Sequence, residues 1–222
     1  YEGKAPYQSD YPLTVNVFHG MKVAGATMGP VSGYGEFLVT AESFDAGTNQ
    51  PKTSFQTATL NEKGTLYAKM GTFPIRIPWL FPDLNLDIEL QDAHLWAQSS
   101  QNGPNGVGQA FDNAKLAGAI RMDDLAVGVS QYVSESCPLV AGCHPNQDFL
   151  TFSEDTNQMK CHWANKSPCW WTGLCKAVVD SCEWMEKSLK ADIDLDGNGN
   201  PDAISASFVV DATSAIITGV GE

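Results

Sequence analysis

The residues best suited to chemistry form an acidic stretch near the end of the chain, from Asp192 to Ser205. Counted from Asp194 as position 1, oxygen-bearing side chains stand at positions 1, 3, 5, 9 and 12: Asp194, Asp196, Asn198, Asp202 and Ser205. Gly199 stands at position 6. This is the spacing of an EF-hand-type calcium loop, in which alternate residues bring oxygens to one hard cation and a glycine permits the sharp turn. The stretch therefore predicts a Ca2+ site.

The match to a calcium loop is incomplete at its end. Ser205 occupies position 12, where the loop normally has a bidentate glutamate, so we expect fewer ligands and weaker binding. Asn200 at position 7 would contribute its backbone carbonyl, and Asp192 would add a carboxylate. The alternative is a polar turn without metal. Against it, the aspartates of this short stretch would repel one another in an empty loop.

The charge of the whole chain limits its partners. The 222 residues carry a formal net charge of -13, which argues against nucleic acid and anionic membranes, because both require a basic surface. An acidic surface suits calcium, cationic partners or solubility. No apolar run approaches the length of a transmembrane segment. The first residue is Tyr1 rather than methionine, which fits removal of a secretion signal or trimming of the sequence.

The cysteines indicate an oxidising compartment. All six fall within one short segment and none forms a C-x-x-C pair: Cys137, Cys143, Cys161, Cys169, Cys175 and Cys182. An even number at this density predicts disulfides, with a connectivity that the sequence does not determine. The alternative is a zinc site formed by Cys143, His144, Cys161 and His162. It lacks the short cysteine knuckle that such sites use.

Most of the chain has the two-residue period of β-strands. Alternation of apolar and polar side chains predicts strands at 13–18, 36–41, 54–60 and 65–70, with a hairpin loop at 61–64. Another strand begins at 84, and a terminal strand begins at Ile204. The apolar phase of the 84–97 stretch slips by one residue, from even to odd positions, so we expect a bulge or bend near Gln91 and Asp92. Residues 73–82 contain three prolines, which predicts a sheet edge or a crossing connection.

Two stretches have the period of a helix instead. Residues 123–133 begin with two aspartates, which favour a helix start, and residues 174–190 carry one apolar stripe. The predicted fold is a mainly β, antiparallel β-sandwich with two short helices, in a single domain spanning residues 1–222. A disulfide-rich, tryptophan-rich insertion occupies about 134–190, and the calcium loop occupies 192–205.

The loop and the strand after it resemble a known group of proteins. The run from Asp194 to Ser205 is similar to the C-terminal D-x-D-G-D-G-x-P-D-A-x-S signature of secreted proteins and lipoproteins of myxobacteria and related bacteria. It also resembles, more loosely, the calcium loops of thrombospondin type 3 repeats and dockerins. The resemblance implies a secreted or envelope location and calcium ligands at Asp194, Asp196, Asn198, Asn200 and Asp202. It implies no activity.

No catalytic motif stands out in the sequence. The chain has no G-x-S-x-G elbow, no H-E-x-x-H and no phosphate loop. Asp87 and Glu89 could form a carboxylate pair, but a solvated strand face more often explains such residues. His162 is similarly better explained by local packing than by a role as general base.

The tryptophan-rich insertion is the better candidate for binding. Trp170 and Trp171 are adjacent, and exposed tryptophans stack on sugar rings or anchor protein partners. The alternative is that they pack against the disulfides. We expect a secreted, cell-surface or periplasmic protein without catalytic activity. It would bind partners or build an extracellular assembly, and one form of that role is a filament subunit joined by strand addition. A carbohydrate-binding module or hydrolase accessory domain is the alternative.

Overall fold

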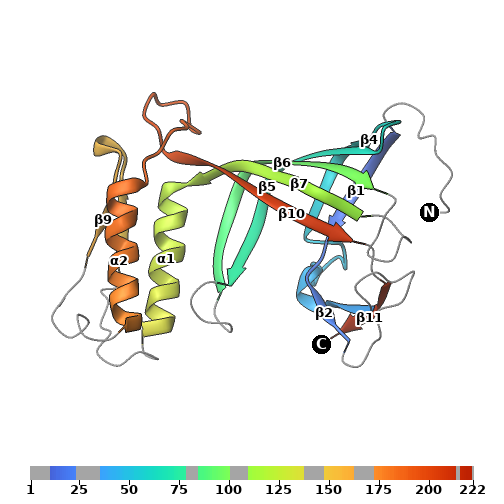
Figure 1. The fold of residues 1–222 in the computed structure, drawn as a ribbon, viewed down its shortest axis with the longest axis horizontal. Coiled ribbons are helices and arrows are strands. Elements are labelled where there is room, and N and C mark those ends of the chain that lie inside the picture. Colours follow the sequence, from blue (N-terminus) through green and yellow to red (C-terminus); the bar gives the residue numbers. More distant parts are fainter. Residues whose placement is uncertain are drawn as a thin grey trace. The chain divides into compact units, whose positions relative to one another are not determined.

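The computed structural model describes residues 11–23, 36–78, 85–100, 110–137, 148–162, 173–213 and 216–221. The strands are β1 (Tyr11–Val17), β2 (Gly20–Lys22), β3 (Glu36–Thr40), β4 (Thr53–Leu60), β5 (Thr65–Pro78), β6 (Asn85–Ser100), β7 (Ala110–Arg121), β8 (Leu150–Ser153), β9 (Gln158–Cys161), β10 (Ala203–Thr213) and β11 (Ile216–Gly221). The helices are α1 (Met122–Ser136) and α2 (Gly173–Ser188) (Figure 1). The described residues also include the short 3-10 turns η1 (Ala41–Ser43) and η3 (Glu154–Thr156).

The described strands form three sheets. The largest has the order β1-β4-β5-β6-β7-β10, the second the order β11-β3-β2, and β8 and β9 form a hairpin. Antiparallel pairing joins β1 to β4, β4 to β5, β2 to β3 and β8 to β9, whereas β11 runs parallel to β3. The predicted mainly β, antiparallel class with two helices is confirmed, and the open sheets are consistent with a sandwich.

The chain divides into two compact units. The first contains residues 1–71, 92–117 and 207–222, and the second contains 72–91 and 118–206. The division falls within β5, β6, β7 and β10, so each of these strands contributes to both units. The core of the second unit includes both helices and the hairpin: Met122, Val129, Tyr132, Phe149, Leu150, Met159, Val178 and Met185 are buried.

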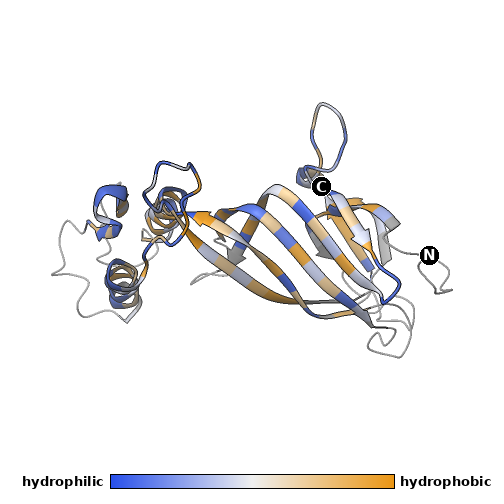
Figure 2. Cartoon of the chain, turned by 90° about the horizontal axis from the view of Figure 1, so that it is seen from above, coloured by the Kyte–Doolittle hydropathy of each residue, from blue (hydrophilic) through white to orange (hydrophobic). Residues whose placement is uncertain are grey.

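The predicted break in β6 is confirmed. Leu86, Ile88 and Leu90 are buried, and after the break Ala93 and Ala97 are buried instead, so the faces of the strand exchange. Asp92 has a φ of 50°, the left-handed conformation of a residue that kinks a strand. Figure 2 shows the alternation of hydrophilic and hydrophobic residues along the strands.

Of the two alternatives predicted for the proline-rich stretch, the crossing connection is wrong over residues 73–78. These residues continue β5, which lies between β4 and β6 in the sheet, and form no crossing connection. A proline lacks the N–H that a ladder needs. The pairing of β4 with β5 involves residues 66–69, so Pro74 comes after the paired part of that ladder. Pro82 lies outside the described residues.

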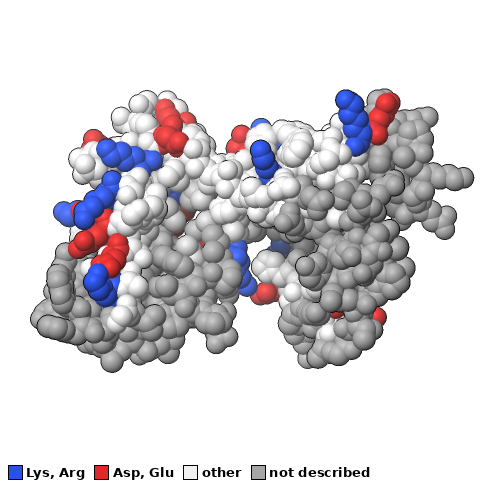
Figure 3. All heavy atoms as spheres, viewed as in Figure 1, with Lys and Arg blue, Asp and Glu red and all other residues white. Residues whose placement is uncertain are grey.

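Both helices appear where their periodicity predicts them. Asp123 and Asp124 lie in the first turn of α1, near the positive end of its dipole. On α2, ion pairs one turn apart join Lys176 to Asp180 and Lys187 to Glu183. Figure 3 shows basic and acidic side chains lying next to one another on the surface. Among the described residues, no helix has the length and hydropathy of a membrane span.

Gly118 of β7 allows a close approach to β6. A Cβ atom at this position would lie 2.6 Å from the Gln91 carbonyl oxygen and 2.7 Å from Leu90 Cγ, closer than real Cβ contacts. We therefore predict that Gly118→Ala lowers the free energy of unfolding by about 1 to 3 kcal/mol, the usual cost of overpacking. Gly71→Ala is the matched control, because nothing lies within 4 Å of its Cβ position. Urea denaturation measures both, and equal midpoints would contradict the prediction.

Candidate metal site

The aspartate loop, residues 192–203, connects α2 to β10 and is closed by backbone hydrogen bonds. Ile193 and Ala203 form an isolated antiparallel bridge. Each of their N–H groups donates to the carbonyl of the other at 3.0 Å, and the Asp202 N–H donates to the Ile193 carbonyl at 2.9 Å. The predicted connection of a helix to a strand, rather than of two helices, is therefore confirmed.

The first half of the loop is organised around Asp194. Its Oδ1 accepts a hydrogen bond from the Gly197 N–H and its Oδ2 accepts one from the Gly199 N–H, both at 2.8 Å. Both glycines have positive φ, 75° and 95°, which residues with a side chain rarely adopt. These hydrogen bonds hold the pKa of Asp194 below its ordinary value, and the bond from the Gly199 N–H has the largest effect. A carboxylate oxygen that accepts one hydrogen bond keeps a lone pair for a cation.

The second half of the loop repeats this pattern at alternate residues. Asp196 Oδ1 accepts a hydrogen bond from the Asn198 N–H at 3.0 Å, and Asn198 Oδ1 accepts one from the Asn200 N–H at 2.7 Å. Each of these exposed side chains therefore folds back to accept a hydrogen bond from the backbone two residues further along the loop. That is the curvature by which alternate oxygens can converge on an ion.

Asp192 and Ser205 form a separate clamp at the base of the loop. Asp192 Oδ1 accepts a hydrogen bond from the Ser205 N–H at 2.7 Å, and its Oδ2 accepts one from the Ser205 hydroxyl at 2.6 Å. The hydroxyl donor, followed by the backbone donor, lowers the pKa of Asp192. Asp192 and Ser205, both predicted as ligands, therefore bind each other.

An acidic cluster forms where the loop meets η3. Glu154, Asp196 and Asp202 each place a carboxylate oxygen so that the three atoms lie within 4.8 Å of one another. Oxygens that share one Ca2+ at roughly 2.3 to 2.6 Å lie at most about 5 Å apart. The cluster could therefore hold a metal ion through three carboxylates.

Asp202 is the buried member of the cluster. It is only 3% exposed, and its Oδ1 accepts a hydrogen bond from the Leu195 N–H at 2.7 Å. Among the described residues, its Oδ2 is buried and accepts no hydrogen bond. Arg121 forms an ion pair with Asp202, with its Nη1 3.7 Å from Oδ2, which is beyond hydrogen-bonding distance. A buried charged oxygen without a hydrogen bond is costly, and cation binding is one way to satisfy it.

The sequence predicted two members of this cluster and missed the third. Asp196 and Asp202 come from the loop, whereas Glu154 lies in the predicted insertion, about forty residues earlier. Spacing cannot reveal a ligand that only tertiary structure brings near. The sequence shows only that Glu154 and Asp155 are adjacent acids. The turn that carries them, which ends at Asn157 in the left-handed conformation, is seen in the structure.

The disulfide prediction is confirmed for part of the segment. Cys161 of β9 bonds to Cys182 of α2, and Cys137 is also disulfide-bonded. The alternative zinc site is wrong for Cys161, because a disulfide sulfur has no thiolate to offer. The adjacent His162 places its Nε2 2.9 Å from the Thr151 hydroxyl, which fits the predicted packing role. Cys143 and Cys169 lie outside the described residues, as does the side chain of Cys175.

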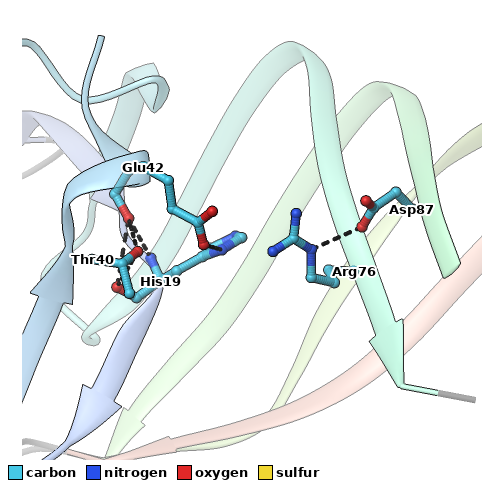
Figure 4. Close-up of polar contacts among 6 residues, drawn as sticks. His19, Thr40, Glu42, Arg76 and Asp87 are labelled. Atoms are coloured by element: carbon cyan, nitrogen blue, oxygen red, sulfur yellow. Dashed lines mark hydrogen bonds and ion pairs between the residues drawn. The ribbon is translucent and has the colours of Figure 1, made fainter. Parts of the chain in front are cut away.

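The other predicted sites divide between solvent-exposed strands and undescribed segments. Asp87 Oδ1 accepts a hydrogen bond from Arg76 Nε at 2.9 Å on an exposed face, as Figure 4 shows, so it is ion-paired there. This supports a solvated polar face rather than a catalytic carboxylate pair. Trp170 and Trp171 lie outside the described residues.

A histidine, an acid and a serine also meet near η1 without forming a catalytic arrangement. His19 Nδ1 lies 3.5 Å from Glu42 Oε1 (Figure 4). The Ser43 hydroxyl, however, accepts a hydrogen bond from the backbone N–H of His19 at 2.9 Å. A nucleophile needs contact with the imidazole itself, which this geometry does not provide.

Comparison with known proteins adds no relative to this picture. No protein-family model, curated protein or solved structure matches the chain, so the likeness of its loop to bacterial calcium-loop proteins stays a prediction.

Proposed function

We propose that this protein is a calcium-stabilised, non-catalytic binding or structural protein of a secreted or cell-surface assembly. The observation that carries the proposal is the buried Asp202 carboxylate, whose Oδ2 accepts no hydrogen bond from the described residues and which lies in a cluster with Glu154 and Asp196. A hard divalent cation would satisfy that oxygen and remove the repulsion among three carboxylates. The bound ion would then act as a structural staple rather than as a catalyst.

Two further features support the extracellular and structural parts of the proposal. A disulfide such as Cys161–Cys182 persists in oxidising compartments. The largest sheet also ends in two edge strands, β1 and β10. On β10, Val209 is 66% exposed and Val210 is 40% exposed. An exposed apolar edge can accept a strand from another chain, which is how a subunit could join a polymer.

Thermal unfolding of the chelator-stripped chain tests the calcium part. Calcium at about 100 times its dissociation constant should add about 2.7 kcal/mol to the free energy of unfolding. For a chain of this size that corresponds to a rise in Tm of roughly 5 to 10 °C. Magnesium at the same concentration controls for ionic strength. An unchanged Tm, together with no metal in elemental analysis, would contradict the proposal.

Asp202→Asn separates the proposed cation from the alternative that Arg121 neutralises Asp202. The substitution keeps an oxygen to accept the Leu195 N–H but removes the charge. If a cation binds here, calcium should no longer raise the Tm of the variant. If only the Arg121 pair matters, the variant should lose stability equally with and without calcium.

A further inference from the structure

We propose that Glu154 is the acidic ligand that the aspartate loop lacks at its twelfth position, so that one divalent cation joins η3 to the loop. The inference rests on the proposed cation binding and assigns it a ligand from outside the loop. The ion would then cross-link two segments about forty residues apart in the sequence. Its removal would loosen the β8–β9 hairpin as well as the loop.

The loop by itself does not supply a complete set of acidic ligands. A calcium loop takes its strongest ligand, a bidentate glutamate, from position 12, where this chain has Ser205. The Ser205 hydroxyl and N–H both donate to Asp192, at 2.6 and 2.7 Å. Ser205 is therefore committed to the clamp at the base of the loop. The site needs a carboxylate from elsewhere to approach the usual ligand number.

Glu154 is placed to supply that carboxylate. It is partly buried in η3, and one of its oxygens lies within 4.8 Å of ligand oxygens from both Asp196 and Asp202. Asp202 provides an independent indication of a missing ligand, because its Oδ2 is buried without a hydrogen bond from any described residue. The guanidinium of Arg121, whose Nη1 lies 3.7 Å from this oxygen, offsets part of the carboxylate charge but donates no hydrogen bond to it.

The turn that carries Glu154 is fixed to the start of the loop. Asn157 Nδ2 donates to the Ala191 carbonyl at 3.0 Å, and the Ala191 N–H donates to Asn157 Oδ1 at 2.8 Å. Asn157 has a φ of 48°, a conformation that asparagine tolerates better than most residues. These paired bonds place the end of η3 beside the residue that precedes Asp192.

The hairpin is also tied to α2. β8 and β9 pair in an antiparallel register from Leu150 with Cys161 to Ser153 with Gln158. Cys161 is then joined to Cys182 by the disulfide. The turn that carries Glu154 is therefore fixed by the paired strands β8 and β9 on either side of it, before any ion binds. Preorganisation of this kind lowers the entropic cost of binding.

Isothermal titration calorimetry, in which calcium is added to the chelator-stripped full chain, tests the assignment. Glu154→Gln keeps the shape of the side chain and removes its charge. We expect the dissociation constant of this variant for calcium to rise at least about tenfold, because loss of even an outer-shell partner of a metal ligand typically weakens metal binding by about that much. Asp155→Asn is the matched control, because it removes the same charge from an exposed neighbour in the same turn. It should stay within about threefold of the wild type.

Two further variants make each outcome decisive. Asp196→Asn keeps a side-chain oxygen in the loop but removes its negative charge, so it should weaken calcium binding in its own right. Glu154→Asp keeps the charge but shortens the reach, so it should bind more weakly than the wild type while folding normally. If the wild type binds calcium and Asp196→Asn binds it more weakly, but both Glu154 variants match the wild type, the role of Glu154 is overturned. If the wild type itself binds no calcium, the proposed function fails as well.

Hydrogen exchange provides a structural readout of the same link. Calcium should slow amide exchange in residues 150–161 of the wild type, because the ion would hold η3 against the loop. In Glu154→Gln the slowing should be confined to the loop. Slowing of both segments in that variant would overturn the cross-link.

Discussion

Phe149→Ala is expected to lower the free energy of unfolding by about 3 to 5 kcal/mol, the usual cost of removing a buried aromatic ring. Phe149 is 1% exposed and immediately precedes β8. Its carbonyl accepts a hydrogen bond from the His162 N–H at 2.9 Å, which closes the β8–β9 hairpin. The next residue, Leu150, exchanges two hydrogen bonds with the buried Ser130 hydroxyl of α1. The surroundings are therefore fixed on two sides and cannot easily collapse into the cavity.

Urea denaturation, monitored by near-UV circular dichroism, measures this loss of unfolding free energy. Trp184→Ala is the matched control, because Trp184 lies on α2 in the same unit but is 59% exposed. Its truncation removes a larger ring and should cost less than about 1 kcal/mol. Equal losses in the two variants would mean that Phe149 is not a core residue.

Replacing both Cys161 and Cys182 by alanine is expected to lower the free energy of unfolding by about 3 kcal/mol. The disulfide closes a loop with a sequence separation of 21 residues. In the chain-entropy description, losing a cross-link of that size frees the unfolded chain by about this amount. The hairpin that carries Glu154 would also lose its covalent tie to α2, so calcium should raise the Tm of this variant less than that of the wild type.

Another double substitution, with both residues on α2, serves as the control for the disulfide variant. Lys176→Ala with Asp180→Ala removes an ion pair whose side chains are both more than half exposed. Such a pair contributes little, so the free energy of unfolding measured with urea should fall by less than about 1 kcal/mol. If the cysteine variant shifts no more than this control, the disulfide does not stabilise the second unit.

The exchange of faces in β6 was accessible from the sequence because a strand has a strict period of two. The apolar set moves from Leu86, Ile88 and Leu90 to Ala93 and Ala97, and the structure places the left-handed residue Asp92 at the change. Local periodicity reports which side chains share a face. It also predicted α1 and α2, because helices too are formed by neighbours in the sequence.

The proline stretch shows what local reasoning left open. Pro74 is a poor residue for a central ladder, and β5 continues through it beyond the residues that pair with β4. The requirement for an N–H donor depends on which residues of the neighbouring strand lie opposite. β4 pairs with β5 before this point. Register between strands is a long-range property that residue type alone does not specify.

The sequence by itself identified the aspartate loop as the candidate cation site, because its oxygen-bearing side chains all come from one short segment with the spacing of a calcium loop. Only the tertiary structure decided that Ser205 turns to Asp192, that the Asp202 carboxylate is buried, and that Glu154 joins the cluster. The physical reason is that burial and convergence of these groups depend on the packing of the β8–β9 hairpin against α2. That packing is set by a disulfide and by the Asn157–Ala191 hydrogen bonds, which join residues more than twenty positions apart.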